Sequence, residues 1–200
     1  MTTRGFVGRS RDEAKTARLP PGQYLVGGFP VLSYEPTPRV ATKDWRFSIE
    51  TDRGGHEWDW EQMLALPQTE ISADIHCVTK WSKFDTSWRG VRIEDFLADG
   101  GLEAHKPYAT IWCHTGYTTN LPTQDLLDGR AMIAHTYERA PLDPEHGGPA
   151  RLLVPHLYFW KSAKWVRGVR FMDEDPPGFW EGYGYHIRGD PWLEQRYAGD

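Results

Sequence analysis

The segment from Ile71 to Ser82 carries the clearest periodic pattern in this chain of 200 residues. Every second residue from Ile71 to Cys77 is apolar and the residues between them are polar, which predicts a strand with one buried face. Cys77 is the last position on that apolar face before the chain turns, so its thiol stands at a strand end, where it can meet a bound group. Free cysteines are among the most buried residues, so the pattern alone also fits a core thiol.

Pattern and composition elsewhere predict an α+β fold that is mostly strands with short helices. Ten Trp, nine Tyr, twenty Gly and fifteen Pro favour β-structure and loops over long helices. We expect Pro67 to end the first helix and Gly100 to be the left-handed C′ residue that follows the second, with a turn at Gly90 and an N-cap at Thr123. The predicted strands cover residues 45–49, 108–120, 132–137 and 164–172, and the helices cover residues 60–66 and 91–99.

The sequence predicts a single domain over residues 21–200, preceded by a loose polar arm over residues 1–20. No internal repeat or long linker divides it. Proline and glycine exclude a helix from Pro20 to Leu32, and we expect an extended segment lying over the domain there. The tail over residues 176–197 is dense in aromatic residues and glycine, so we expect a strap held by ring packing.

Charge and cysteine count narrow the class of protein. A formal net charge of −5 argues against a protein that follows nucleic-acid phosphates. No apolar run approaches the roughly 18 residues that span a bilayer, so we expect no membrane segment. The first residues lack the apolar core of an export signal, and two cysteines form no disulfide framework. A reducing cytoplasm is therefore the expected location.

Two further clusters carry groups that bind anions. The loop H-G-G-P-A-R from His146 to Arg151 combines glycines, which let backbone approach a ligand closely, with the planar donor fork of an arginine. The segment K-S-A-K-W from Lys161 to Trp165 places a hydroxyl and a lysine before a predicted strand, where backbone N–H groups can join them in gripping a phosphate. Each cluster alone is also compatible with an ordinary surface loop.

Taken in order, these clusters resemble the sulfite-oxidase superfamily of molybdopterin-dependent oxidoreductases, in particular the catalytic domain of bacterial protein-methionine-sulfoxide reductases. Four motifs stand at the family's spacing: C-V-x-x-W-S from Cys77, W-x-G-V from Trp88, a histidine five residues before Arg151, and S-x-K-W from Ser162. The resemblance extends from Phe29 to the aromatic tail. It implies a mostly β, sulfite-oxidase-type molybdopterin-binding domain with short helices.

The resemblance also implies a molybdenum-molybdopterin cofactor (Mo-MPT) whose metal is bound by the thiolate of Cys77, a soft ligand that suits this metal. Lys80 and Trp81 follow the ligand and are implied as catalytic residues. Residues of the two downstream clusters are implied to hold the cofactor, largely through its phosphate: His146, Arg151, Ser162, Ala163 and Lys164. Pterin contacts are implied for an upstream segment and for one strand residue: Gly28, Phe29, Pro30 and Cys113.

By resemblance, the chemistry is two-electron oxygen-atom transfer on a small-molecule sulfur- or nitrogen-oxide substrate. Sulfite oxidation is an alternative, although relatives with that activity carry an arginine where this chain has Ser82. A non-catalytic molybdopterin carrier is another, and a hydrolase using Cys77 with His76 or His114 is a third. Adjacent strand residues point to opposite faces, which disfavours His76 as a base for Cys77. Two cysteines cannot hold an iron–sulfur cluster, so we expect a separate electron-transfer protein.

Overall fold

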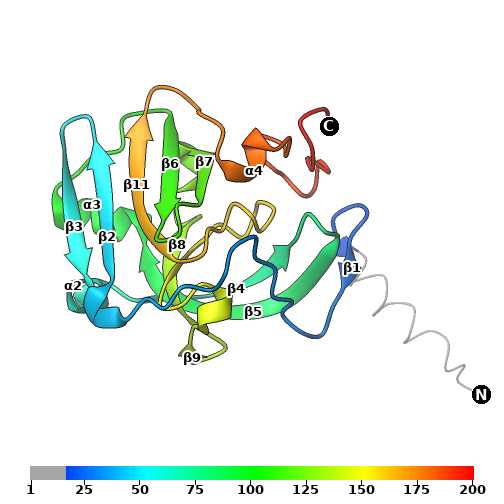
Figure 1. The fold of residues 1–200 in the computed structure, drawn as a ribbon, viewed down its shortest axis with the longest axis horizontal. Coiled ribbons are helices and arrows are strands. Elements are labelled where there is room, and N and C mark those ends of the chain that lie inside the picture. The colour runs from blue at the N-terminus through cyan, green and yellow to red at the C-terminus, as the bar shows by residue number, and fades with distance from the viewer. Residues whose placement is uncertain (1–16) are drawn as a thin grey trace, which may run out of the picture.

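The computed structural model describes residues 17–200, and these form two β-sheets with short helices at their edges (Figure 1). One sheet has six strands in the order β1-β5-β8-β10, with β4 beside β5 and β9 beside β8. Its strands are β1 (Tyr24–Leu25), β4 (Thr69–His76), β5 (Trp81–Arg92), β8 (Met132–Tyr137), β9 (Ala140–Pro141) and β10 (Arg151–Leu153). The predicted α+β fold with mostly strands is confirmed.

The second sheet has five strands in the order β3-β2-β11-β6-β7. All neighbours in it are antiparallel except β11 and β2, which run parallel. Its strands are β2 (Arg46–Thr51), β3 (Gly54–Asp59), β6 (Tyr108–Cys113), β7 (Thr118–Pro122) and β11 (Val166–Met172). The α-helices are α2 (Trp60–Ala65), α3 (Ile93–Gly100) and α4 (Phe179–Gly182), and three 3-10 helices are η1 (Thr42–Asp44), η2 (Thr123–Asp125) and η3 (Pro144–His146).

Local sequence explains where the two longer helices begin and end. Asp59 and Gln62 form a reciprocal capping box at the start of α2, and Pro67 follows its end as predicted. The buried face of α3 carries Ile93, Phe96 and Leu97. Its C-terminal residue in the left-handed region is Gly101, at φ 62°, so the prediction of Gly100 was wrong by one position. Gly100 ends the helix instead, and a Cβ there would lie 3.1 Å from the ring of Trp58.

Three other local predictions were wrong for identifiable reasons. Residues 108–120 form two strands, β6 and β7, because the chain reverses between Cys113 and Tyr117. Gly90 lies inside β5 rather than at a turn, at a register shift against β8, where a Cβ would be 2.1 Å from the carbonyl oxygen of Ile133. Thr123 does not cap a helix, because its hydroxyl donates to the carbonyl of Lys106.

The N-terminal segment and the tail lie mostly over the sheets. Residues 17–41 follow an irregular path that adds the two-residue strand β1 beside β5 and crosses in front of the first sheet (Figure 1). The tail is held by ring packing as predicted, with the rings of Trp180 and Tyr185 stacked at 5.1 Å. The predicted arm lies mostly outside the described residues. No helix in the described part of the chain is long and apolar enough to cross a membrane.

Candidate active site

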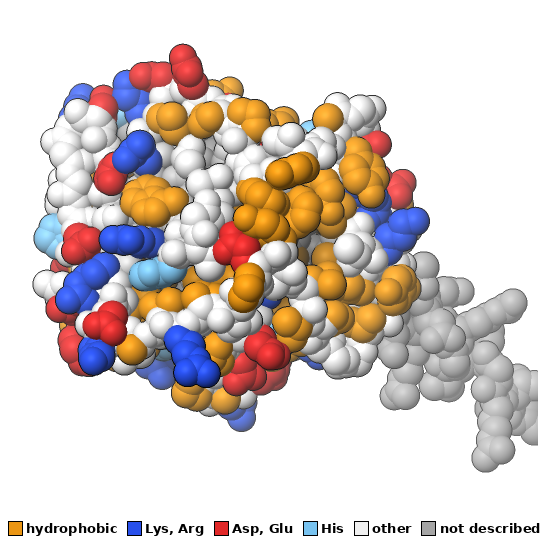
Figure 2. Space-filling view, in the orientation of Figure 1, with side chains coloured by type: hydrophobic (Ala, Val, Ile, Leu, Met, Phe, Trp, Pro, Cys, Tyr) orange, Lys and Arg blue, Asp and Glu red, His pale blue; other side chains and the backbone are white. Residues whose placement is uncertain are grey.

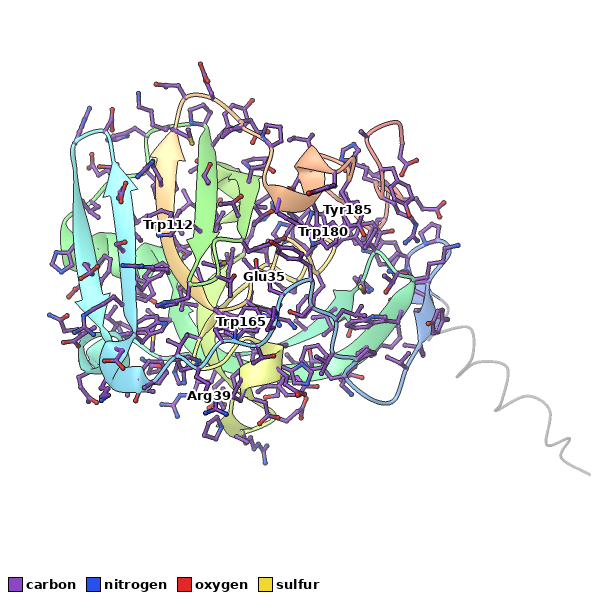
Figure 3. The ribbon with its side chains drawn as sticks, viewed as in Figure 1. Glu35, Arg39, Trp112, Trp165, Trp180 and Tyr185 are labelled. Carbon is purple, nitrogen blue, oxygen red and sulfur yellow. The ribbon has the colours of Figure 1, made fainter. Side chains whose placement is uncertain are left out.

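A cavity of about 330 Å³ lies where five segments meet: the N-terminal segment, the turn after β4, the turn between β6 and β7, the loops around β10, and the tail. Figure 3 shows Trp180 and Tyr185 of the tail side by side, with Glu35 and Trp165 below them. The wall is mainly aromatic and apolar. It consists of Phe29, Pro30, Leu32–Glu35, Cys77–Thr79, Trp81, Thr115, Tyr117, His146, Arg151, Phe159, Trp160, Ser162–Trp165, Trp180 and Tyr185.

Cys77 reaches this cavity from a tight turn that joins β4 to β5. The amide of Cys77 donates to the carbonyl of Trp81 at 2.9 Å, and the amide of Lys80 donates back to Cys77 at 3.0 Å. Lys80 closes the turn at φ 78°. Burial raises the pKa of the Cys77 thiol, while a hydrogen bond from the Thr79 hydroxyl and the charge of Arg196 oppose that rise. Because Cys77 lies on the cavity wall, a soft metal bound there would coordinate its sulfur, and coordination would remove the proton despite the raised pKa.

Arg151 is a buried cation without an acidic partner. It is 1% exposed, and no carboxylate of the described residues lies within ion-pair distance of it. Its guanidinium donates instead to the carbonyl oxygens of His146, at 2.8 Å, and Ser162, and lies 4.1 Å from the ring centre of Phe159. Burial lowers its pKa to about 9. A buried charge without a counter-ion is costly, so this position is suited to a bound anion.

Lys164 adds a second cation beside Arg151 to form a positive cluster, and His146 lies next to both, with its pKa lowered by burial and by their charges. The Lys164 ammonium donates to the carbonyl oxygens of Leu32, at 2.8 Å, and Glu145, at 2.7 Å. Burial and the charge of Arg151 lower its pKa to about 8. The His146 ring stacks on Phe29 with centroids 3.9 Å apart, and its buried Nδ1 has no partner among the described residues. Orphaned donors and unpaired cations at one place fit the phosphate-bearing end of the implied cofactor.

Ser162 and Ala163 lie on the cavity wall beside these groups. Ser162 is 1% exposed, and its hydroxyl accepts a hydrogen bond from the amide of Val154 at 2.8 Å. Gly147 adopts φ 106°, and a Cβ there would lie 3.0 Å from Lys164 Cα. The glycine therefore allows the loop around His146 to lie directly against the segment that carries Lys164.

The structure brings nine of the twelve residues implied by the resemblance to the cavity wall: Phe29, Pro30, Cys77, Trp81, His146, Arg151, Ser162, Ala163 and Lys164. Three are not on the wall. Gly28 and Lys80 are exposed beside it. Cys113 lies on the buried face of β6 within the core, where burial raises the pKa of its thiol strongly. The roles of all twelve residues stay predictions.

Several wall residues were not predicted from the sequence. Tyr34 and Glu35 belong to the N-terminal segment, and Tyr34 stacks on Phe179 of the tail at 4.0 Å. Trp180 and Tyr185 lie in the aromatic tail, which the sequence indicates only as packing. Burial raises the pKa of Tyr185, so its phenol stays protonated at neutral pH. The high density of aromatic residues in the tail was the sequence feature that could have indicated these wall residues.

The two segments that border the cavity expose most of the large hydrophobic side chains of the described residues. Ten of the eleven such side chains lie in the N-terminal segment and the tail; these ten are Tyr24, Leu25, Val31, Leu32, Tyr34, Tyr183, Ile187, Trp192, Leu193 and Tyr197. Leu32 and Tyr34 are also on the cavity wall. Figure 2 shows hydrophobic side chains gathered on the half of this face that lies over these segments, whereas charges dominate over β2 and β3. Exposed apolar surface favours substrates or partners that carry apolar surface.

Comparison with known families agrees with this geometry. The model of the family described as "Oxidoreductase molybdopterin binding domain" matches residues 34–180, and the chain belongs to that family. It is therefore a molybdopterin-binding oxidoreductase domain, related to sulfite oxidase and to the protein-methionine-sulfoxide reductases. The resemblance drawn from the motifs around Cys77, His146 and Ser162 is confirmed at the level of the family.

Among individual proteins, the chain is 42% identical over 199 residues to an uncharacterized oxidoreductase, YuiH, of Bacillus subtilis, covering 98% of this chain and 100% of that one. It is 29% identical to mitochondrial sulfite oxidase of Homo sapiens, covering 75% of this chain but 33% of that protein. The sulfane dehydrogenase SoxCD of Paracoccus pantotrophus superposes with a TM-score of 0.61 at 21% identity, over 69% of this chain and 40% of the other. That likeness shows the fold alone.

Proposed function

We propose that this protein is an enzyme that binds Mo-MPT and reduces a neutral sulfur-oxide or nitrogen-oxide substrate by two-electron oxygen-atom transfer. The distribution of charge around the cavity carries this proposal. The basic residues on the described wall are His146, Arg151 and Lys164. Arg151 lowers the pKa of both His146 and Lys164, and Lys164 lowers that of His146. The wall next to Cys77 in sequence consists of Val78, Thr79 and Trp81, which carry no charge. The positive cluster thus suits the cofactor phosphate, and a substrate near Cys77 meets neutral side chains.

Each part of the site has a distinct task in this proposal. Cys77 holds the metal, and the cluster of Arg151 and Lys164 holds the phosphate. When bound, the cofactor supplies two-electron redox chemistry with transfer of an oxygen atom. The substrate takes up two electrons and two protons overall and leaves as the reduced compound and water.

The protein itself orients the substrate oxygen. Tyr185 offers a protonated phenol on the cavity wall. Trp81 lies on the same wall, and its buried indole N–H has no hydrogen-bond partner in the described part of the chain. Both groups are donors, and we assign them to the substrate oxide, with the aromatic walls excluding bulk water.

Sulfite oxidation is the second candidate, because several relatives are named sulfite oxidase. A doubly charged anion needs a cation close to the metal ligand. The residue five positions after Cys77 is Ser82, which is fully buried and hydrogen-bonded to His76 Nδ1 at 2.8 Å. It therefore does not reach the cavity, and Arg196, whose charge opposes the rise in the pKa of Cys77, is not on the wall either. These observations favour a neutral substrate over sulfite.

The proposal is tested first by metal content. We expect one molybdenum per chain in the purified protein, with release of the pterin on denaturation. Cys77→Ser should lose most of the metal because a hydroxyl is a poor ligand for a soft centre, whereas Cys113→Ala should keep it. Elemental analysis measures both. A wild-type protein that binds no molybdenum would refute the assignment.

Substrate class is tested with the loaded enzyme and a reduced dye as electron source. A neutral S-oxide or N-oxide should be turned over with a kcat/KM at least about tenfold above that for sulfite in the reverse direction, a difference of about 1.4 kcal/mol. The opposite ratio would favour the second candidate. Loaded protein whose metal spectrum does not respond to any reductant would point to a non-catalytic carrier.

We also propose a separate electron-transfer protein and a cytoplasmic location. The described residues hold two cysteines, both free and buried, and no group of three or more His, Cys, Asp or Glu side chains that could ligate a metal. Electrons must therefore come from outside this part of the chain. Fractionation of cells expressing the tagged protein tests the location, since recovery in an exported fraction would contradict it.

A further inference from the structure

An arginine of the tail holds the Cys77 turn from the side away from the cavity. Arg196 is 7% exposed, and its guanidinium donates to the carbonyl oxygen of Val78 at 2.9 Å and to that of Pro21 at 3.2 Å. Val78 follows the metal ligand directly. The carbonyl of Cys77 accepts from the side chain of Gln23 at 3.0 Å, so both carbonyls are held by residues far away in sequence.

The carboxylates near Arg196 are both exposed. Its guanidinium donates to backbone carbonyls, while its backbone amide donates to the Asp200 carboxylate at 2.8 Å, and the charge of Arg196 contributes to lowering the pKa of that carboxyl. The carboxylate of Glu194 lies 3.9 Å away on a side chain that is 53% exposed, and solvent weakens the attraction of exposed charges. The guanidinium also lies 5.0 Å from the ring centre of Tyr158. A buried cation that faces only exposed carboxylates, next to the Cys77 turn, calls for an explanation beyond packing.

Both ends of the described chain converge at this arginine. Gly22 adopts φ +70°, and a Cβ there would lie 3.2 Å from the Arg196 guanidinium and 2.9 Å from the Glu194 carboxylate. At this point the N-terminal segment approaches the two tail side chains so closely that a side chain at position 22 would displace them. Arg196 joins these two segments to the Cys77 turn in one contact.

We propose that Arg196 is a positioning residue for the metal site: it fixes the Cys77 turn and sets a permanent positive charge behind the ligand. The expected effect of Arg196 on the metal rests on the proposed function, whereas its expected effect on the turn does not. A fixed positive charge close to a redox centre favours the state with the additional electron. Loss of that charge should lower the reduction potential of the bound metal.

The effect on the turn is tested in the metal-free protein by amide hydrogen exchange. In Arg196→Gln, the amides of Cys77 and Lys80 should exchange about tenfold faster than in wild type, because the turn loses its external hydrogen bond. Gly22→Ala should produce the same change by displacing the guanidinium while keeping its charge. Arg170→Gln, an exposed arginine that pairs with Glu50, serves as control and should exchange like wild type. Unchanged protection in both Arg196→Gln and Gly22→Ala would overturn the positioning role.

The effect on the metal is tested in the loaded protein by an EPR-monitored redox titration. Arg196→Gln should shift the midpoint potential downward, and Arg196→Lys should restore most of the shift because it keeps the charge. A Gln variant that folds but loads no metal while the Lys variant loads also supports the proposal. Equal potentials in Arg196→Gln and wild type would overturn the electrostatic role. If wild type itself binds no molybdenum, the proposed function fails, and the exchange experiment still decides the role of Arg196 in the turn.

Discussion

At the scale of single residues, this site is defined by charges that lack partners. Arg151, Lys164 and Arg196 are each wholly or partly buried, and each directs its hydrogen bonds to backbone carbonyls. In a protein with no bound ligand, burying a charge without an opposite charge costs stability. Their presence is explained if bound groups supply the missing negative charge: a phosphate beside Arg151 and Lys164 on the cavity wall, and a metal-bound thiolate of Cys77 near Arg196, which lies outside the wall.

The pH dependence of the metal-free protein tests this account at Lys164. Its pKa is lowered by burial to about 8 from an ordinary value of 10.5. Between these two values the unfolded chain binds more protons than the folded one, so the free energy of unfolding should rise as pH rises through this window. The rise is at most about 1.4 kcal/mol per pH unit, and solvent exposure of the side chain reduces it.

Lys164→Met should lack this contribution. Urea unfolding of wild type and Lys164→Met between pH 7.5 and pH 10 gives the free energy of unfolding of each protein against pH. The difference between the two slopes is the contribution of Lys164, because the other titrating groups are common to both proteins and cancel. Lys43→Met, at an exposed position in η1, is the matched control and should show the wild-type slope. A Lys164→Met slope that equals the wild-type slope would contradict the lowered pKa.

At the scale of elements, the pairing of β5 with β8 depends on a close backbone approach. The register shifts between Arg89 and Gly90, and a Cβ at position 90 would lie 2.1 Å from the carbonyl oxygen of Ile133 and 2.7 Å from Ala134 Cα. Both obstacles are backbone atoms, so no side-chain rotation can relieve the clash. Since β5 begins directly after the Cys77 turn, a shift of this strand would move Cys77.

Gly90→Ala should therefore destabilise the protein by about 1–3 kcal/mol or more. Gly182→Ala is the matched control, because a Cβ at that position meets nothing within 4 Å. Its effect should be within about 0.5 kcal/mol of wild type. Guanidinium unfolding curves give both differences. Similar midpoints for the two variants would show that the strands can separate at low cost.

The same elements show how far sequence reasoning extends. Alternation over residues 71–77 correctly predicted β4 and placed Cys77 at its end, because a half-buried strand imposes a period of two on its sequence. The reversal between Cys113 and Tyr117 was missed, because the apolar alternation continues across it. Tyr34, Glu35 and Arg196 were missed for another reason. They come from irregular segments whose position depends on tertiary contacts, and such segments have no period.

At the scale of the whole molecule, the tail is joined to the cofactor-facing loop by a buried ion pair. Lys161 Nζ lies 2.5 Å from Glu181 Oε1, and the two side chains are 0% and 1% exposed. The same carboxylate oxygen accepts from the indole of Trp160 at 2.8 Å and from the hydroxyl of Thr119 at 3.0 Å. Lys161 directly precedes Ser162, and Glu181 lies in α4 beside Trp180. The pair therefore connects two walls of the cavity.

Removing one partner of this pair should cost far more than removing both. Glu181→Gln leaves the Lys161 ammonium buried without a countercharge, and the expected loss is about 3–5 kcal/mol in the free energy of unfolding. The double variant Lys161→Met with Glu181→Leu should regain much of that loss, because it buries no charge. Glu50→Gln, which breaks the exposed pair with Arg170, should cost under about 1 kcal/mol. If Glu181→Gln were as mild as Glu50→Gln, the tail would be held by its stacked rings alone, and the ion pair would not be what keeps Trp180 and Tyr185 against the cavity.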